Sequence, residues 1–221
     1  MDAIITAAGK NSRMIKDFEN MNKTPIHKLK LKINNKEILI HTIENVLNSD
    51  VEKVTLCLGH FKHEIISLLE EYDLANEVNL SINPLVDVGL SKTIENALRN
   101  DTNKYYLFTA ADQPTITTQT INNLIDTLNN SPHPKNTISV LRRRKYGKLN
   151  TAEGLGMPFC CYGKLLYDYI HGENDNLNPI LRKMIDDKVD FYGVKEKNKL
   201  ELLNINHYDD YLYIKNEIEK K

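Results

Sequence analysis

The chain has no tryptophan, only three cysteines and no apolar run long enough to span a membrane. A membrane helix needs roughly 18 apolar residues, and Met1–Ile5 is too soon interrupted to form a secretory core. We therefore expect a soluble, cytoplasmic protein with no membrane partner. Cys57, Cys160 and Cys161 lack metal-ligand spacing, and an odd number of thiols suits a reducing compartment where thiols stay free. We interpret the adjacent Cys160 and Cys161 as small apolar residues of a strand rather than as a redox pair.

The sequence also lacks an excess of either charge. Lys and Arg total 29 against 30 Asp and Glu, so the formal net charge is -1 and no global field attracts nucleic acid. One basic run, Leu141–Lys148, is compatible with RNA binding, but a solvated hairpin is the favoured interpretation. We expect no nucleic-acid partner, although an RNA-binding module remains an alternative with its own signature, namely salt-sensitive RNA retention.

Apolar runs of strand length alternate with amphipathic stretches of helix length in this chain of 221 residues. The alternation is typical of a mostly parallel sheet covered by helices, within one domain spanning residues 1–221. Strands are expected at Ala3–Thr6, Lys53–Leu58, Asn79–Ile82, Tyr105–Thr109, Thr137–Leu141, Asp190–Val194 and Leu202–Ile205. Helices are expected at Lys36–Leu47, Lys62–Tyr72, Lys92–Leu98, Thr118–Leu128, Leu165–Ile170, Pro179–Ile185 and Asp209–Glu219. The segment 142–159 breaks the alternation, and we interpret it as an irregular or β-flap excursion across one face.

The first strand runs into a stretch with little side-chain bulk, "TAAGKNSRM". Ala7, Ala8 and Gly9 let backbone N–H groups approach an anion, and cationic donors follow from Lys10, Arg13 and Lys16. This composition suits a polyphosphate. It matches neither the dinucleotide fingerprint nor the loop that ends in Gly-Lys-Ser/Thr. A tight turn followed by a solvated arginine is an equally open interpretation.

A carboxylate follows another strong strand, in "FTAADQP". Asp112 stands where the strand ends, and Pro114 prevents the strand from continuing. Because open parallel sheets bind ligands beyond the carboxyl ends of their strands, this side chain is expected to face the ligand crevice. It is either a turn cap or a ligand for the magnesium ion that accompanies polyphosphates.

A third junction, "NPLVDVGLSKTIENAL", brings a glycine and two hydroxyls to the start of a helix. Gly89 permits close approach of a backbone, and Ser91 and Thr93 offer hydrogen bonds at the same edge of the sheet. Taken alone, Ser91 as a plain N-cap is the simpler interpretation.

In this order the three segments resemble nucleotidyltransferases that join a nucleoside monophosphate to a small phosphorylated acceptor. "TAAGKNSRM" looks like the signature of that superfamily, and "ADQP" resembles the branch of molybdenum cofactor nucleotidyltransferases, MobA-like and MocA-like. The likeness continues through Gly156–Ile170 and Leu202–Ile214. It implies a three-layer α/β/α, Rossmann-like nucleotidyltransferase domain with a mostly parallel, twisted sheet.

The resemblance also implies roles for individual residues. The triphosphate would lie on the backbone of Ala8 and Gly9 with Arg13, and the base and ribose would meet Ala7, Gly89, Ser91 and Thr93. Asp112 would bind magnesium, the expected cofactor. The family lysine is best matched by Lys28, with Lys16 as a rival.

The sequence departs from the family pattern in three places that concern these residue roles. Ile15 follows Arg-Met where the family has glycine, and an insertion that includes Asp17–Lys23 precedes Lys28. In the closing segment, Asn204 and Asn206 stand where relatives carry an aspartate as second metal ligand. We expect Asn206 to supply an amide oxygen to the metal, with Asn204 as the alternative. The acceptor-side segment 171–179 matches only approximately.

The implied reaction transfers the nucleoside monophosphate of CTP or GTP to a phosphorylated acceptor, with molybdopterin favoured, and releases pyrophosphate. The acceptor phosphate is already an anion, so charge neutralisation and alignment are needed rather than a general base. Alternatives are a sugar-phosphate or polyol-phosphate acceptor, or a nucleotide-binding regulatory protein without turnover. Neither the base, the acceptor nor the oligomeric state follows from the sequence.

Overall fold

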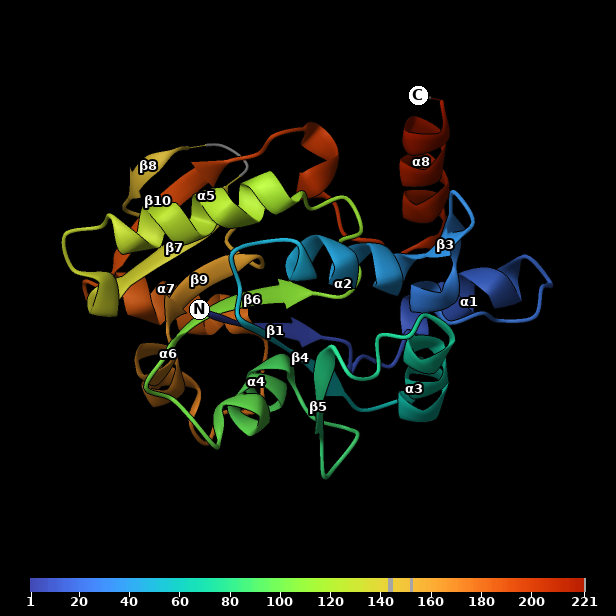
Figure 1. The fold of residues 1–221 in the computed structure, drawn as a ribbon, viewed down its shortest axis with the longest axis horizontal. Coiled ribbons are helices and arrows are strands. Elements are labelled where there is room, and N and C mark those ends of the chain that lie inside the picture. The colour runs from blue at the N-terminus through green and yellow to red at the C-terminus, as the bar shows by residue number, and fades with distance from the viewer. Residues whose placement is uncertain (143–144, 152, 221) are drawn as a thin grey trace.

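The computed structural model describes residues 1–142, 145–151 and 153–220, and these form an eight-stranded sheet with helices on both faces (Figure 1). The strands in spatial order are β5 (Val78–Ile82), β4 (Lys53–Leu58), β1 (Asp2–Thr6), β6 (Tyr105–Ala110), β9 (Phe159–Tyr162), β7 (Thr137–Arg142), β10 (Asp190–Lys195) and β8 (Gly147–Leu149). The pairs β5–β4, β4–β1, β1–β6 and β7–β10 are parallel, whereas β9 and β8 are antiparallel to their neighbours. The sheet is therefore mostly parallel.

The helices form two layers because residues of the central strands alternate between the two faces of the sheet. Ala3 and Ile5 belong to one hydrophobic core and Ile4 to the other. The first core contains residues of α1 (Ser12–Asn20), α2 (Ile38–Leu47), α3 (Lys62–Glu71), α5 (Thr118–Asn129) and α8 (Tyr208–Glu219). The second contains residues of α4 (Leu90–Leu98), α6 (Gly163–Ile170) and α7 (Leu177–Asp186). The three-layer α/β/α architecture expected from the sequence is confirmed.

Smaller elements join these layers. A hairpin of β2 (Lys32–Ile33) and β3 (Lys36–Glu37) follows the short 3₁₀ helix η1 (Lys28–Lys30), and two further 3₁₀ helices are η2 (Pro134–Asn136) and η3 (Lys199–Leu202). All the expected helices and all but one of the expected strands are present, with ends that differ by at most two residues.

The strand expected at Leu202–Ile205 is wrong. Leu202 ends η3, and the residues that follow it form neither helix nor strand. The backbone N–H of Ile205 donates to the carbonyl oxygen of Asp112 at 3.0 Å, in place of a strand ladder. The apolar pattern reflects burial of Ile205 against one core, which an irregular segment achieves as well as a strand.

The segment 142–159 contains strand β8, and the hairpin expected for Leu141–Lys148 is also wrong. Within the described residues, β8 pairs with β10 rather than with β7. Arg142 is not solvated, because it is only 3% exposed at the end of β7. Arg143, Arg144 and Ala152 lie outside the described residues.

The three cysteines are free and buried. Cys160 and Cys161 are consecutive residues of β9 that enter opposite cores, which confirms their interpretation as apolar strand residues. Burial raises the pKa of the Cys57 thiol to about 12. No described helix is long and apolar enough to cross a membrane.

Candidate active site

The loop after β1, residues 7–11, is the predicted anion-binding segment and is called the anion loop below. It lies at the carboxyl edge of the sheet, between the ends of two neighbouring strands. The backbone N–H of Ala7 donates to the carbonyl of Cys57 on β4 at 2.9 Å, which holds the start of the loop. A Cβ atom on Gly9 would meet no other atom within 4 Å, so the loop opens onto free space. Gly59 packs closely against the loop, since a Cβ atom on Gly59 would lie only 2.9 Å from the carbonyl oxygen of Ala8. The backbone of the loop is thus available to a ligand on one side only.

Helix α1 begins directly after this loop and was not expected from the sequence. Its N-cap, Asn11, has left-handed backbone angles and no side-chain cap hydrogen bond. The Asn11 amide instead donates to the carbonyl of Ile26 and accepts from the backbone N–H of Lys28, both at 3.3 Å. Asn11 therefore ties the anion loop to the segment that carries Lys28.

Lys28 and Asp112 form an ion pair at the ends of the central strands. The two side chains are only 18% and 13% exposed. Asp112 follows β6, which pairs in parallel with β1, so the carboxylate and the anion loop emerge at one edge. The Asn204 amide donates to the second carboxylate oxygen of Asp112 at 3.0 Å. Asp112 is thus held from two sides.

These groups line one cavity of about 310 Å³. Its walls include the sequence-predicted residues Ala7, Ala8, Gly9, Arg13, Lys28, Thr93, Asp112 and Asn206. Arg13 reaches it from the first turn of α1, and Thr93 from α4, where the Thr93 hydroxyl accepts a hydrogen bond from Asn83 at 2.9 Å. The structure thus brings together the anion loop, two cations and the carboxylate that the sequence placed at separate junctions.

Four sequence-predicted residues are not among the described residues that line this cavity. Lys10 is exposed and pairs with Asp87 at 2.9 Å, and Lys16 is exposed on α1. The remaining two, Gly89 and Ser91, contact the segment 174–175 instead. A Cβ on Gly89 would lie 2.7 Å from the Asn174 backbone, which explains the need for glycine.

The interpretation of Ser91 as an N-cap is wrong. Gly89 occupies the N-cap position of α4, and Ser91 is the second residue of the helix. Its fully buried hydroxyl accepts from the backbone N–H of Asp175 at 2.9 Å, while its own N–H donates to the Asp175 carbonyl. Ser91 therefore fastens α4 to the segment before α7.

His27 is a residue of the cavity wall that sequence reasoning missed. Burial, followed by the nearby charges of Lys28 and Lys30, lowers its pKa from 6.5 to about 4. Its Nδ1 accepts from the backbone N–H of Leu29 at 3.3 Å, and its ring lies 4.5 Å from that of Phe61. The imidazole is therefore neutral near pH 7. The only signal in the sequence was its position directly before Lys28.

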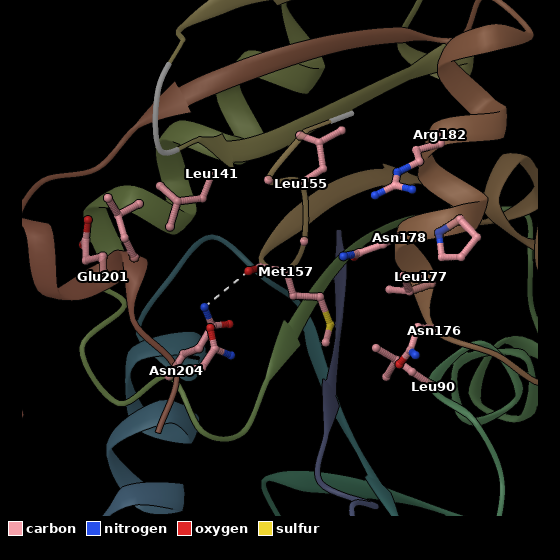
Figure 2. Close-up of a pocket in the computed structure, with 15 residues that line it drawn as sticks. Leu90, Leu141, Leu155, Met157, Asn176, Leu177, Asn178, Arg182, Glu201 and Asn204 are labelled. Carbon is pink, nitrogen blue, oxygen red and sulfur yellow. Dashed lines mark hydrogen bonds between the residues drawn. The ribbon is translucent and has the colours of Figure 1, made fainter. Parts of the chain in front are cut away.

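A second cavity, of about 520 Å³, adjoins the first (Figure 2). Leu90, Met157 and Asn204 line both cavities, so these residues mark the junction. Figure 2 shows Asn178 and Arg182 of α7 pointing toward Met157 from one side, with Asn204 on the other side. None of the described residues that line it is aromatic.

The wall beside Asn204 is held by a buried carboxylate. Glu201 is fully buried and accepts hydrogen bonds from the hydroxyls of Thr117 and Thr120 and from the backbone N–H groups of Thr117 and Lys197. These donors compensate the cost of burying its charge. They also fasten the segment that carries Asn204 to the start of α5.

The oxygen ligands of the first cavity fit a magnesium ion. In the described part of the chain, no three His, Cys, Asp or Glu side chains are grouped as a metal site. Magnesium, however, is commonly held by one or two carboxylates together with substrate phosphates and water. The Asp112 carboxylate and the Asn206 amide, both in the cavity wall, are oxygen donors of this kind.

Taken together, the parallel sheet, the bare loop after β1 and the cation–carboxylate pair at the strand ends define a nucleotide-binding α/β domain. Residues 3–186 match the MobA-like NTP transferase domain, and the chain belongs to this family. Among solved structures, a nucleotidyl transferase from Methanothermobacter thermautotrophicus shares 33% identity over 99% of this chain and 97% of its own, with a TM-score of 0.89. The chain is therefore a nucleotidyltransferase.

Two more distant structures share the fold. A 4-diphosphocytidyl-2C-methyl-D-erythritol synthase from Anaerococcus prevotii is 15% identical, covering 99% of this chain and 95% of its own, with a TM-score of 0.69. An inositol-1-phosphate CTP transferase from T. maritima is 13% identical, covering 100% and 96%, with a TM-score of 0.64. No curated protein matches the chain significantly.

Proposed function

We propose that this enzyme transfers the nucleoside monophosphate of CTP or GTP to the phosphate of a small acceptor, in the presence of magnesium, and releases pyrophosphate. The observation that carries the proposal is the meeting of two cavities at Asn204. One contains the anion loop, Lys28 and Asp112, and the other is large enough for a phosphorylated metabolite.

In the first cavity, the triphosphate lies against the backbone of Ala8 and Gly9 and pairs with Arg13. Lys28 is favoured over Lys16 as the phosphate lysine, because Lys28 lines the cavity and Lys16 is exposed outside it. Asp112 and Asn206 would hold a magnesium ion, which would neutralise part of the charge of the triphosphate. Lys28 then exchanges its carboxylate partner for phosphate oxygens.

The acceptor phosphate reaches the α-phosphorus from the second cavity. One of its oxygens forms the new bond to that phosphorus, and the bond to the bridging oxygen of the β-phosphate breaks. Pyrophosphate leaves with the electron pair. Arg13 and Lys28 reduce the repulsion between the two anions and stabilise the charge that develops on the leaving group.

The residues that line the second cavity favour a sugar or polyol phosphate over molybdopterin as acceptor. A flat pterin gains most from an aromatic platform, and the described lining residues offer amides and aliphatic side chains instead. Hydroxyl groups suit amides such as those of Asn176 and Asn178. Two proteins of the same fold are named for a polyol phosphate and an erythritol derivative.

The test is pyrophosphate release from each of the four nucleoside triphosphates with magnesium and a panel of acceptors. The panel contains molybdopterin, inositol 1-phosphate, glycerol 3-phosphate and sugar 1-phosphates. Asp112→Asn should reduce turnover by about a thousandfold, whereas Asp126→Asn, an exposed carboxylate on α5, should not. Nucleotide binding without release from any pair would overturn the proposal and favour a regulatory protein. Salt-sensitive RNA retention that survives Asp112→Asn, without release, would favour an RNA-binding module.

A further inference from the structure

We infer that the acceptor carries a second anionic group besides the phosphate that reacts, and that Arg182 binds it. The inference rests on the proposed function and concerns the far end of the second cavity. Arg182 lies in that wall, on α7. Within the residues that the structure describes, its guanidinium has no ion pair or hydrogen bond.

The position of Arg182 separates it from the reacting groups. The phosphate that attacks must lie at the junction of the two cavities, beside Asn204 and the Lys28–Asp112 pair. Arg182 lines only the second cavity, and Figure 2 places it on the side opposite Asn204. It is therefore placed to bind the distal part of an acceptor whose phosphate occupies the junction.

The neighbouring groups leave the charge of Arg182 available. The ammonium group of the next residue, Lys183, lies over the ring of Tyr169, 5.8 Å from the ring centroid, and so does not share the position of Arg182. The carboxylate in the cavity wall, Glu201, already accepts several hydrogen bonds from hydroxyls and backbone N–H groups. Figure 2 shows it on the far side of the cavity from Arg182. Among its described lining residues, the cavity thus presents one unpaired guanidinium, that of Arg182.

A guanidinium in such a position favours carboxylate or phosphate oxygens, which it binds through two parallel hydrogen bonds. Asn178 lies in the same wall, one turn before Arg182 on α7, and its amide suits a hydroxyl next to the anionic group. The expected acceptor is a hydroxylated phosphate ester that ends in a carboxylate or in a second phosphate.

Matched pairs of probes test this inference and show whether the second anionic group is a carboxylate or a phosphate. 3-Phosphoglycerate and glycerol 3-phosphate differ by a carboxylate in place of a hydroxymethyl group. Fructose 1,6-bisphosphate and fructose 1-phosphate differ by one phosphate. Binding of each probe is measured by calorimetry with magnesium and a non-hydrolysable CTP or GTP analogue, and pyrophosphate release is measured with the true nucleotides. The member with two anionic groups should bind roughly tenfold more tightly than its partner in at least one pair.

The variants Arg182→Gln and Lys183→Gln distinguish a specific contact from general attraction. Arg182→Gln should abolish the preference for the probe with two anionic groups and should raise the KM for that acceptor with little change in kcat. Lys183→Gln should keep the wild-type preference and the wild-type KM. Equal binding within both pairs, no binding by any probe, or a preference that survives Arg182→Gln would overturn the inference. Pyrophosphate release with an ester whose only anionic group is its phosphate, at a rate that Arg182→Gln leaves unchanged, would sustain the proposed function alone and overturn the inference. An Arg182-dependent preference without release would sustain the site and refute the transfer reaction.

Discussion

Arg13 is an exposed guanidinium that lines the first cavity and has no ion-pair partner among the described residues. Its contact with the triphosphate would form only in the complex, so its loss should affect catalysis rather than folding. We expect Arg13→Ala to lower kcat/KM by roughly a hundredfold, or about 2 to 3 kcal/mol. The free energy of unfolding should change by less than about 0.5 kcal/mol.

The matched control for Arg13 is Lys16→Ala, an exposed cation on the same helix. Steady-state kinetics should show activity within about twofold of the wild type for this variant. The opposite result, with Lys16→Ala impaired and Arg13→Ala active, would reassign the phosphate contact to Lys16.

His27 makes stability depend on pH. Its pKa is about 4 in the folded protein and 6.5 in the unfolded chain, so between these values the unfolded chain binds more protons. The neutral His27 therefore does not lower the free energy of unfolding above pH 6.5. As pH falls toward 4, the free energy of unfolding decreases by up to about 3 kcal/mol, because the unfolded chain takes up a proton at His27 that the folded protein does not. Urea unfolding across that range should show a shallower decline for His27→Asn. The exposed His63→Asn should keep the wild-type slope, and equal slopes for all three proteins would contradict this assignment.

Residue types at strand ends could be predicted from the sequence, whereas contacts between distant loops could not. Asp112 and the loop after β1 meet because both follow parallel strands that are neighbours. By contrast, the burial of His27 depends on Phe61, and the role of Asn11 depends on Ile26 and Lys28. No local pattern reports such pairings, since they arise only when separate segments pack.

At the scale of elements, the junction between β4 and α3 supports the anion loop. Gly59 lies there, and a methyl group on it would come within 2.9 Å of the Ala8 carbonyl oxygen and 3.0 Å of the Ala8 Cβ. Because both contacts involve the loop itself, Gly59→Ala should displace the loop. We expect a loss of roughly 1 to 3 kcal/mol in the free energy of unfolding and weaker nucleotide binding.

Chemical denaturation and nucleotide titration measure the two effects of Gly59→Ala. The control is Gly156→Ala, because a Cβ at Gly156 would meet no atom within 4 Å. Its free energy of unfolding should stay close to that of the wild type. A Gly59→Ala protein with wild-type stability and affinity would show that the loop tolerates the displacement.

Elements with a strong apolar period were predictable, and those whose form depends on tertiary contacts were not. Helix α1 was not predicted because only Met14 and Phe18 of its nine residues are buried, and its N-cap, Asn11, has left-handed backbone angles and no side-chain cap hydrogen bond. The segment 203–206 has the apolar content of a strand, yet its ladder is replaced by the hydrogen bond from Ile205 to Asp112. This irregular path brings Asn204 and Asn206 into the cavity wall.

On the scale of the whole molecule, the second cavity is the feature that the sequence concealed most completely. Its walls come from α4, from the residues after β6, from β7, from 154–157, from α7 with the residue before it, and from η3 with the residues after it. Each segment contributes one to five residues, and the motifs quoted from the sequence include only a few of them, such as Gln113 of "ADQP". Only the folded chain shows that an arginine of α7 and an asparagine near the C-terminal helix enclose the same space.

Ligand binding to this assembled site should stabilise the whole molecule, because the unfolded chain has no such cavity. A nucleotide present at about a hundred times its dissociation constant should add about 2.7 kcal/mol to the free energy of unfolding. In thermal denaturation with magnesium, either CTP or GTP should raise Tm more than the other three nucleoside triphosphates. Asp112→Asn should remove the additional stabilisation due to magnesium while retaining part of that due to nucleotide, because the anion loop and Arg13 are intact. Equal shifts with all four nucleotides would refute base selectivity, and a magnesium effect unchanged in Asp112→Asn would exclude this carboxylate as the metal ligand.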